Sequence, residues 1–96
     1  MTPKRLGKIK QRLYALKKSP RGLKPAIFVS LAEQLGRKLS PRGNHPNYVR
    51  FDEPVLAPPL SIPAHRELKT GTACCIIDQL LSDVDEWELF FHGRAE

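Results

Sequence analysis

The chain has 96 residues, the size of one small domain, and a net charge of +6. Its clean apolar runs, such as residues 26–29, are far shorter than the roughly 18 residues that a membrane span needs, so we expect neither a span nor a signal peptide. The two cysteines, Cys74 and Cys75, are adjacent. This spacing suits neither a zinc site nor a redox pair, and we expect reduced thiols in a cytoplasmic protein.

Charge is distributed unevenly along the chain. Residues 1–50 carry 13 Lys and Arg with a single acid, Glu33, whereas residues 51–96 carry 3 Lys and Arg with 9 Asp and Glu. Cations concentrated in this way are typical of a surface that binds a polyanion, although they can also form a solvated basic surface. We therefore expect the first half of the chain to contact a nucleic acid.

The first predicted element is a basic amphipathic helix over residues 4–18. Leucine and isoleucine recur there at steps of three and four, and the other faces carry lysine and arginine without any acid. Lys8 and Arg12 on these faces are candidate RNA-binding residues; alternatively, the cations only interact with solvent. This helix and the turn after it form a basic extension, residues 1–24, ahead of the main domain, residues 25–96.

The next segment predicts a second helix and a β-hairpin. Pro25 suits the first turn of a helix, and Gly36 is placed to end it in the left-handed conformation. Short strands are expected over residues 37–40 and 47–51, joined by a proline–glycine turn. His45 then lies where the second strand leaves the turn.

The remaining residues complete an α+β fold. Residues 52–59 hold three prolines and predict a loop, and a third strand is expected over residues 60–62. A helix should then open at Thr70 or Thr72, and Asp85 should cap a separate short helix over residues 86–91. The predicted architecture is a three-stranded antiparallel sheet with helices on one face, plus an extra N-terminal helix.

Four short motifs follow one another in an order that resembles the HicA-type mRNA interferase toxins, the YcfA-like family. They are the helix-ending Gly36, the Gly-Asn-His turn at residues 43–45, the Pro-Ala-His strand end at residues 63–65 and the helix opener at residues 67–72. The resemblance covers roughly residues 25–90. It implies a fold like that of double-stranded-RNA-binding domains and the toxin role in a type II toxin–antitoxin system.

The same resemblance implies an activity and a partner. Members of the family cleave mRNA as endoribonucleases without a metal or another cofactor, and a HicB-type antitoxin protein silences them. Their catalytic histidine corresponds to His45. An imidazole suits acid–base work on a ribose 2′-OH and its phosphate because it titrates near neutral pH, while cations stabilise the charge that builds on the phosphoryl oxygens.

Further residues around this histidine are candidate RNA contacts. The sequence places them in the same motifs or close by: Arg42, Asn44, Arg50, His65 and Lys69. For His65, a hydrogen bond to a loop carbonyl is the alternative role. No His-x-x-x-His or Asp-x-Asp spacing occurs, so we expect no metal site.

Two departures from the family pattern keep a second function open. Asn44 stands where the family has a serine, and Pro46 follows His45 directly. The alternative is a non-catalytic RNA-binding module on the same fold, which would contact RNA through its shape, its 2′-OH groups and its phosphates.

Overall fold

Three helices and a three-stranded sheet make up the part of the chain that the computed structural model describes, residues 1–40, 46–63 and 67–94. In chain order they are α1 (Pro3–Lys18), α2 (Pro25–Gln34), β1 (Lys38–Ser40), β2 (Asn47–Arg50), β3 (Leu56–Ser61) and α3 (Thr70–Arg94). The strands pair antiparallel in the order β1-β2-β3. The predicted α+β class and its three-stranded antiparallel sheet are therefore confirmed.

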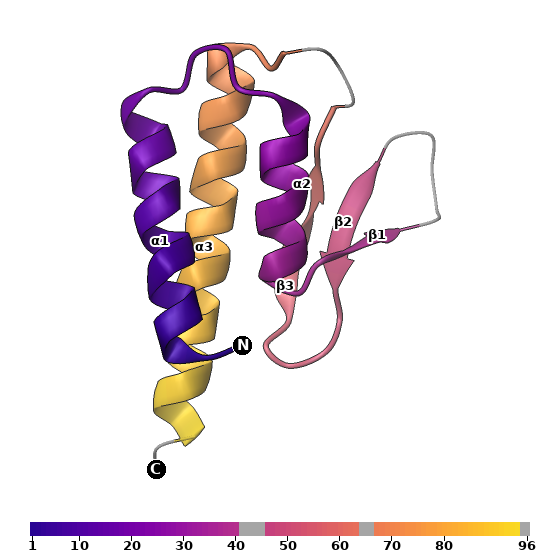
Figure 1. Ribbon diagram of the computed structural model, residues 1–96. Coiled ribbons are helices and arrows are strands. Elements are labelled where there is room, and N and C mark those ends of the chain that lie inside the picture. Colours follow the sequence, from indigo (N-terminus) through magenta and orange to yellow (C-terminus); the bar gives the residue numbers. More distant parts are fainter. Residues whose placement is uncertain (41–45, 64–66, 95–96) are drawn as a thin grey trace.

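The helices form the larger part of the molecule. Helices α2 and α3 lie on the same side of the sheet, and α1 packs along α3 (Figure 1). Leu6, Ile9 and Leu13 of α1 are buried in the same hydrophobic cluster as residues of α2, α3 and the strands. Residues 1–24 thus contribute to the core that they share with the rest of the chain.

The ends of α1 and α2 follow from capping residues that are visible in the sequence. The Thr2 Oγ1 atom accepts a hydrogen bond from the backbone N–H of Arg5 at 3.2 Å, and this bond caps α1. Pro25 occupies the first turn of α2, and Gly36 follows the helix with a φ of +95°. The predictions for both helices are confirmed.

The third strand begins earlier than expected. It starts at Leu56 and includes Pro58 and Pro59, so the predicted loop over residues 52–59 is wrong for its last four positions. Prolines are tolerated because β3 is an edge strand that pairs with β2 alone, and the pairing is irregular between Tyr48 and Arg50. The missing N–H groups therefore break no regular ladder.

The last helix is continuous. It runs from Thr70 to Arg94, so the predicted break before a separate C-terminal helix is wrong. The buried positions Leu80, Val84 and Trp87 follow one another at steps of four and three, which extends a single inward stripe through the expected break. Among the helices of the described residues, none is both long and apolar enough to cross a membrane.

Candidate nucleic-acid interface

One end of the sheet brings together the chain segments that flank the two motif histidines. Asn47 pairs with Ser61, and the backbone N–H of Ile62 donates to the carbonyl oxygen of Pro46 at 3.3 Å. Because β2 and β3 are antiparallel, the chain enters β2 and leaves β3 at the same end of the sheet (Figure 1). The strand register, which sequence reasoning left open, therefore places the described flanks of both motif segments, Pro46 and Ile62, side by side.

The motif residues on these two segments are not themselves described. Arg42, Asn44 and His45 lie outside the described residues, and so does His65. Their predicted roles in catalysis and RNA binding stay predictions.

Lys69 lies exposed just before α3. The backbone N–H of its neighbour Leu68 donates to the carbonyl oxygen of Leu23 at 2.9 Å, which holds the start of α3 against the connection between α1 and α2. That connection carries the exposed side chains of Arg21 and Lys24. Lys69 is thus near other cations, which come from a distant part of the sequence.

Arg50 faces inward and holds the β2–β3 connection in place. Its guanidinium donates to the carbonyl oxygens of Pro54 at 3.0 Å, Glu53 at 2.9 Å and Gly36 at 3.4 Å. The guanidinium carbon also lies 4.9 Å from the centre of the Trp87 ring, within cation–π range. These contacts give Arg50 a structural role, and we do not include it in the RNA surface proposed below.

A buried ion pair connects the sheet to α3, and sequence reasoning missed it. The guanidinium of Arg37 binds the Asp83 carboxylate through two hydrogen bonds, of 2.6 and 2.9 Å, and both residues are 1% exposed. Arg37 also donates to the carbonyl oxygens of Tyr48 at 2.7 Å and Pro58 at 3.1 Å. Burial raises the pKa of the Asp83 carboxyl group, and the arginine opposes that shift by favouring the charged form.

Five of the seven cations of α1 fall into two groups according to the side of the helix on which they lie; Lys4 and Lys18, near its two ends, are exposed and belong to neither group. On the side facing α3, Lys10 Nζ lies 2.9 Å from a Glu88 oxygen and Lys17 Nζ lies 3.1 Å from an Asp78 oxygen. The hydrogen bond to Glu88 is the main cause that raises the pKa of Lys10. These two lysines are therefore engaged with acids of α3.

The second group faces α2 and solvent. Within the described part of the chain, Arg5, Lys8 and Arg12 are exposed and make no ion pair. All three line a groove of about 190 Å³ between α1 and α2. This group contains the predicted RNA contacts Lys8 and Arg12. It adds Arg5, which the sequence-based prediction missed although it lies one helical turn before Lys8.

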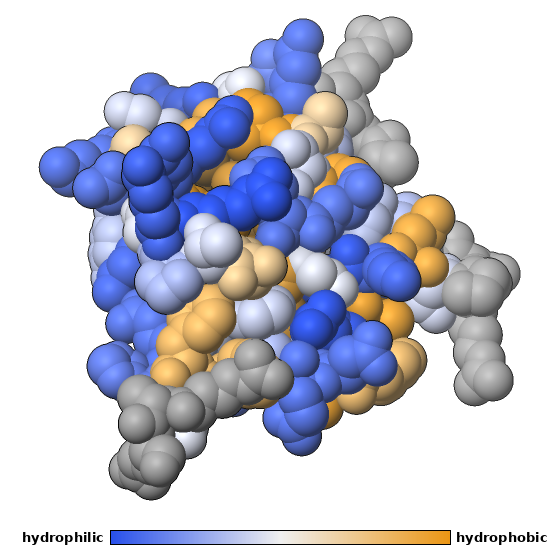
Figure 2. Space-filling view, turned by 60° about the horizontal axis from the view of Figure 1, so that its bottom comes forward, coloured by the Kyte–Doolittle hydropathy of each residue, from blue (hydrophilic) through white to orange (hydrophobic). Residues whose placement is uncertain are grey.

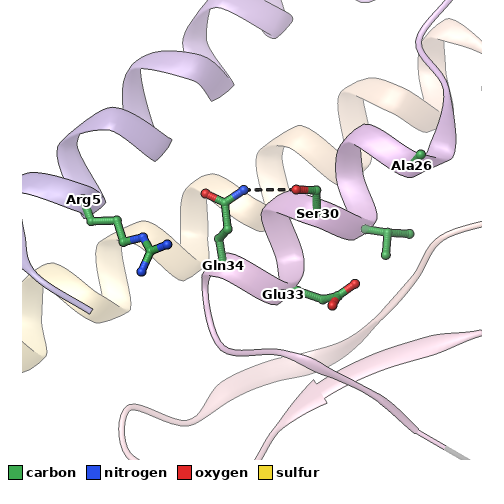
Figure 3. Close-up of a pocket in the computed structure, with 6 residues that line it drawn as sticks. Arg5, Ala26, Ser30, Glu33 and Gln34 are labelled. Atoms are coloured by element: carbon green, nitrogen blue, oxygen red, sulfur yellow. Dashed lines mark hydrogen bonds between the residues drawn. The ribbon is translucent and has the colours of Figure 1, made fainter.

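A wider groove, of about 710 Å³, continues from Arg5 along α2. Figure 3 shows Arg5 reaching from α1 towards Gln34, whose Nε2 atom donates to the Ser30 hydroxyl at 3.1 Å. Glu33 is the acid among the residues that line this groove. Arg5, Ser30 and Gln34 supply hydrogen-bonding groups along this groove, and Arg5 is the single cation among the described residues that line it.

Comparisons of the chain with protein-family models, with curated proteins and with solved structures found no match. Among the described residues, no group of three or more His, Cys, Asp or Glu side chains could hold a metal ion. Function is therefore inferred from the geometry of the described residues together with the sequence motifs.

Proposed function

We propose that this protein binds RNA through α1 and cleaves it as a HicA-type toxin, with His45 as the catalytic residue. The observation that carries the RNA-binding part is the division of the α1 cations: Lys10 and Lys17 pair with α3, whereas Arg5, Lys8 and Arg12 are left for a ligand. Unpaired cations gathered on one helix face form the electrostatic footprint of a nucleic-acid-binding surface.

The spacing of these cations suits a sugar–phosphate backbone. Arg5 and Arg12 are seven residues apart on α1. At a rise of 1.5 Å per residue their Cα atoms are separated by about 10 Å along the helix axis. That length is about the axial rise of three nucleotides in one strand of a duplex, at roughly 3.4 Å each. Arginine can bind a phosphate through two parallel hydrogen bonds, whereas lysine supplies a point charge.

The fold supports the catalytic part of the proposal. The order α2-β1-β2-β3-α3 is that of the double-stranded-RNA-binding-domain-like fold that the resemblance implies. The hydrogen bond between Ile62 and Pro46 joins the described flanks of the two motif segments, which supports the proposal that His45 acts as an acid–base residue at this end of the sheet. The toxin would act on mRNA in the cytoplasm, and a HicB-type antitoxin would silence it by covering the His45 face.

Salt dependence of RNA binding tests the role of α1. Replacing Arg5, Lys8 and Arg12 together by glutamine should weaken RNA binding. The plot of log K against log salt concentration should become less steep by about 2, since each lost phosphate contact contributes roughly 0.7 to 0.9 to the magnitude of its negative slope. The matched control replaces Lys10 and Lys17, the two paired lysines, by glutamine. An equal decrease in salt dependence in both variants would show that RNA does not bind preferentially to the side of α1 that carries Arg5, Lys8 and Arg12.

Growth and RNA integrity test the catalytic histidine. Expression of the wild-type chain in bacterial cells should arrest growth and fragment mRNA, and His45→Ala should abolish both effects while leaving RNA affinity within about threefold. If neither chain affects growth or RNA although both bind RNA, the non-catalytic RNA-binding module is the function, the alternative that the departures at Asn44 and Pro46 keep open.

A further inference from the structure

A third groove, separate from the two beside α2, lies where α3 passes the β2–β3 connection. It has a volume of about 320 Å³ and is lined by Pro54 and Val55 from the connection and by Leu89 and Phe90 from α3, with Glu53 and Glu86 completing it. Figure 2 shows hydrophobic surface among hydrophilic surface at the end of the molecule where this connection lies. We call this feature the acidic groove.

Large apolar side chains are unusually exposed here. Leu89 is 65% exposed and Val55 is 45% exposed, and both line the groove. Scattered apolar residues occur on every protein surface, but two exposed ones facing each other across one groove, with the half-buried Phe90 between them and the core, indicate a binding site.

The acidic groove is held in shape by the inward-facing contacts of Arg50. This residue binds the carbonyl oxygens of Glu53 and Pro54 and stacks on Trp87, and the Trp87 indole N–H donates to the Leu35 carbonyl at 2.8 Å. The Phe90 ring packs edge-on against Trp87 with centroids 5.7 Å apart. Both walls are therefore fixed to the core, and a ligand would find a preformed site.

The charges of the acidic groove specify the chemistry of its occupant. Within the described residues, neither Glu53 nor Glu86 makes an ion pair, and both are exposed. Asp52, also exposed, precedes Glu53 in the sequence and adds negative charge to the same connection. Such a surface repels the phosphates of RNA but complements lysine or arginine placed beside apolar side chains.

We propose that the acidic groove docks a cationic amphipathic segment of a partner protein. A second copy of this chain fits less well, because its most basic element, α1, buries Leu6, Ile9 and Leu13 in its own core and cannot present them to the groove. The expected occupant inserts apolar side chains between Val55 and Leu89 and places cations against Glu53 and Glu86. This docking site does not depend on RNA binding or cleavage.

Model peptides and the single tryptophan, Trp87, provide the test. The probes are two helical peptides of about 14 residues with the same leucine positions, one with lysine and one with glutamate on the polar face. Fluorescence of Trp87, which contacts the groove residue Phe90, reports binding to the full chain. The lysine peptide should bind and the glutamate peptide should not. Because the chain carries a net charge of +6, general attraction cannot explain binding of the lysine peptide.

Variants then locate the site. Leu89→Ser should weaken binding of the lysine peptide about tenfold, because an apolar contact is lost at the rim. Glu53→Gln combined with Glu86→Gln should weaken it about fivefold and reduce its salt dependence. The control Glu33→Gln neutralises an exposed carboxylate on α2, outside the acidic groove, and should leave binding unchanged.

Three results would overturn the proposal. The first is equal binding of the lysine and glutamate peptides, and the second is equal affinity of all variants and the wild type for the lysine peptide. The third is self-association of the free chain in sedimentation experiments that Leu89→Ser abolishes, which would make a second copy the occupant. Circular dichroism of each variant separates loss of binding from loss of folding, and the exposed position of Leu89 favours an intact fold.

Discussion

At the scale of single residues, the buried pair of Arg37 and Asp83 determines how α3 sits on the sheet. Moving two charges out of water is costly, and the cost is offset only where each polar atom finds a partner. Here the guanidinium binds both carboxylate oxygens and two backbone carbonyls, and no described buried side-chain polar atom lacks a hydrogen bond. The pair therefore favours one arrangement of helix and strands over similar alternatives.

Removing one member of this pair should destabilise the fold strongly. Arg37→Met or Asp83→Leu alone should lower the free energy of unfolding by about 3–5 kcal/mol, since either change leaves a buried charge without its partner. The double variant should recover most of that loss. Urea denaturation followed by circular dichroism measures all three. As a control, Lys17→Met breaks an exposed ion pair and should lower the free energy of unfolding by less than about 1 kcal/mol. If the losses of Arg37→Met and Asp83→Leu simply add in the double variant, the two side chains do not stabilise each other.

Two glycines allow backbone strain to be separated from crowding. Gly22 and Gly36 both have positive φ, +67° and +95°. A Cβ atom at Gly36 would lie 2.5 Å from Arg50 Nη1, whereas one at Gly22 would have no neighbour within 4 Å. Gly22→Ala should therefore cost about 1–2 kcal/mol from the left-handed backbone alone. Gly36→Ala should cost at least about 1 kcal/mol more, because Arg50 must release its carbonyl partners. Equal losses in thermal melts would show that Arg50 moves aside without cost.

At the scale of elements, sequence reasoning located helix starts and ends well where one side chain or backbone preference decides them. Pro25 and Gly36 act through fixed φ or a left-handed backbone, and the structure shows both as expected at the ends of α2. The Thr2 cap of α1 is equally local, although it was not predicted. Asp85 also has the chemistry of a cap, yet it lies inside α3. Packing of Val84 and Trp87 against the core keeps the helix continuous there, and such tertiary contacts are not visible in a local pattern.

This difference between a real and an expected cap can be measured. Thr2→Ala should lower the free energy of unfolding by about 1 kcal/mol, because the N–H of Arg5 loses its acceptor. Asp85→Ala should change it by less than about 0.5 kcal/mol, because an exposed aspartate within a helix caps nothing. A larger loss for Asp85→Ala than for Thr2→Ala in denaturant titrations would mean that α3 is divided near residue 85.

The same reasoning explains what sequence could predict about the candidate site. Charge counting identified Lys8 and Arg12 on α1, but it could not separate them from Lys10, which the fold pairs with Glu88 more than seventy residues later. Arg50 was predicted to bind phosphate because it is close to the motif in sequence, and the fold gives it backbone contacts that hold the β2–β3 connection and reach Gly36. Roles that depend on distant partners were beyond any local pattern.

At the scale of the whole molecule, the two halves of the chain carry opposite charges, and packing determines which surface each charge occupies. The acids of the second half neutralise one side of α1 and surround the acidic groove, while the other side of α1 stays basic. RNA and a cationic partner would thus be directed to different surfaces by the sign of the potential. This separation requires α1 to be docked, because its orientation decides which cations are paired.

The basic extension should for that reason be indispensable for folding, although it lies outside the motifs. A chain lacking residues 1–24 loses Leu6, Ile9 and Leu13 from the core and exposes the α3 surface against which α1 packs. Each large apolar side chain removed from a core costs about 2–5 kcal/mol, and small domains have only about 5–15 kcal/mol in total. We expect the truncated chain to lose its cooperative thermal transition in circular dichroism.

Single alanine substitutions in α1 test the same expectation quantitatively, without removing a whole segment of the chain. Leu13→Ala, at a fully buried position, should lower the free energy of unfolding by about 3 kcal/mol. Leu16→Ala, at a half-buried position on the same stripe, should lower it by about half as much. If instead the truncated chain melts cooperatively at the wild-type temperature, α1 is a separable arm. Its pairing with Glu88 and Asp78 would then be too weak to orient Arg5, Lys8 and Arg12 towards RNA.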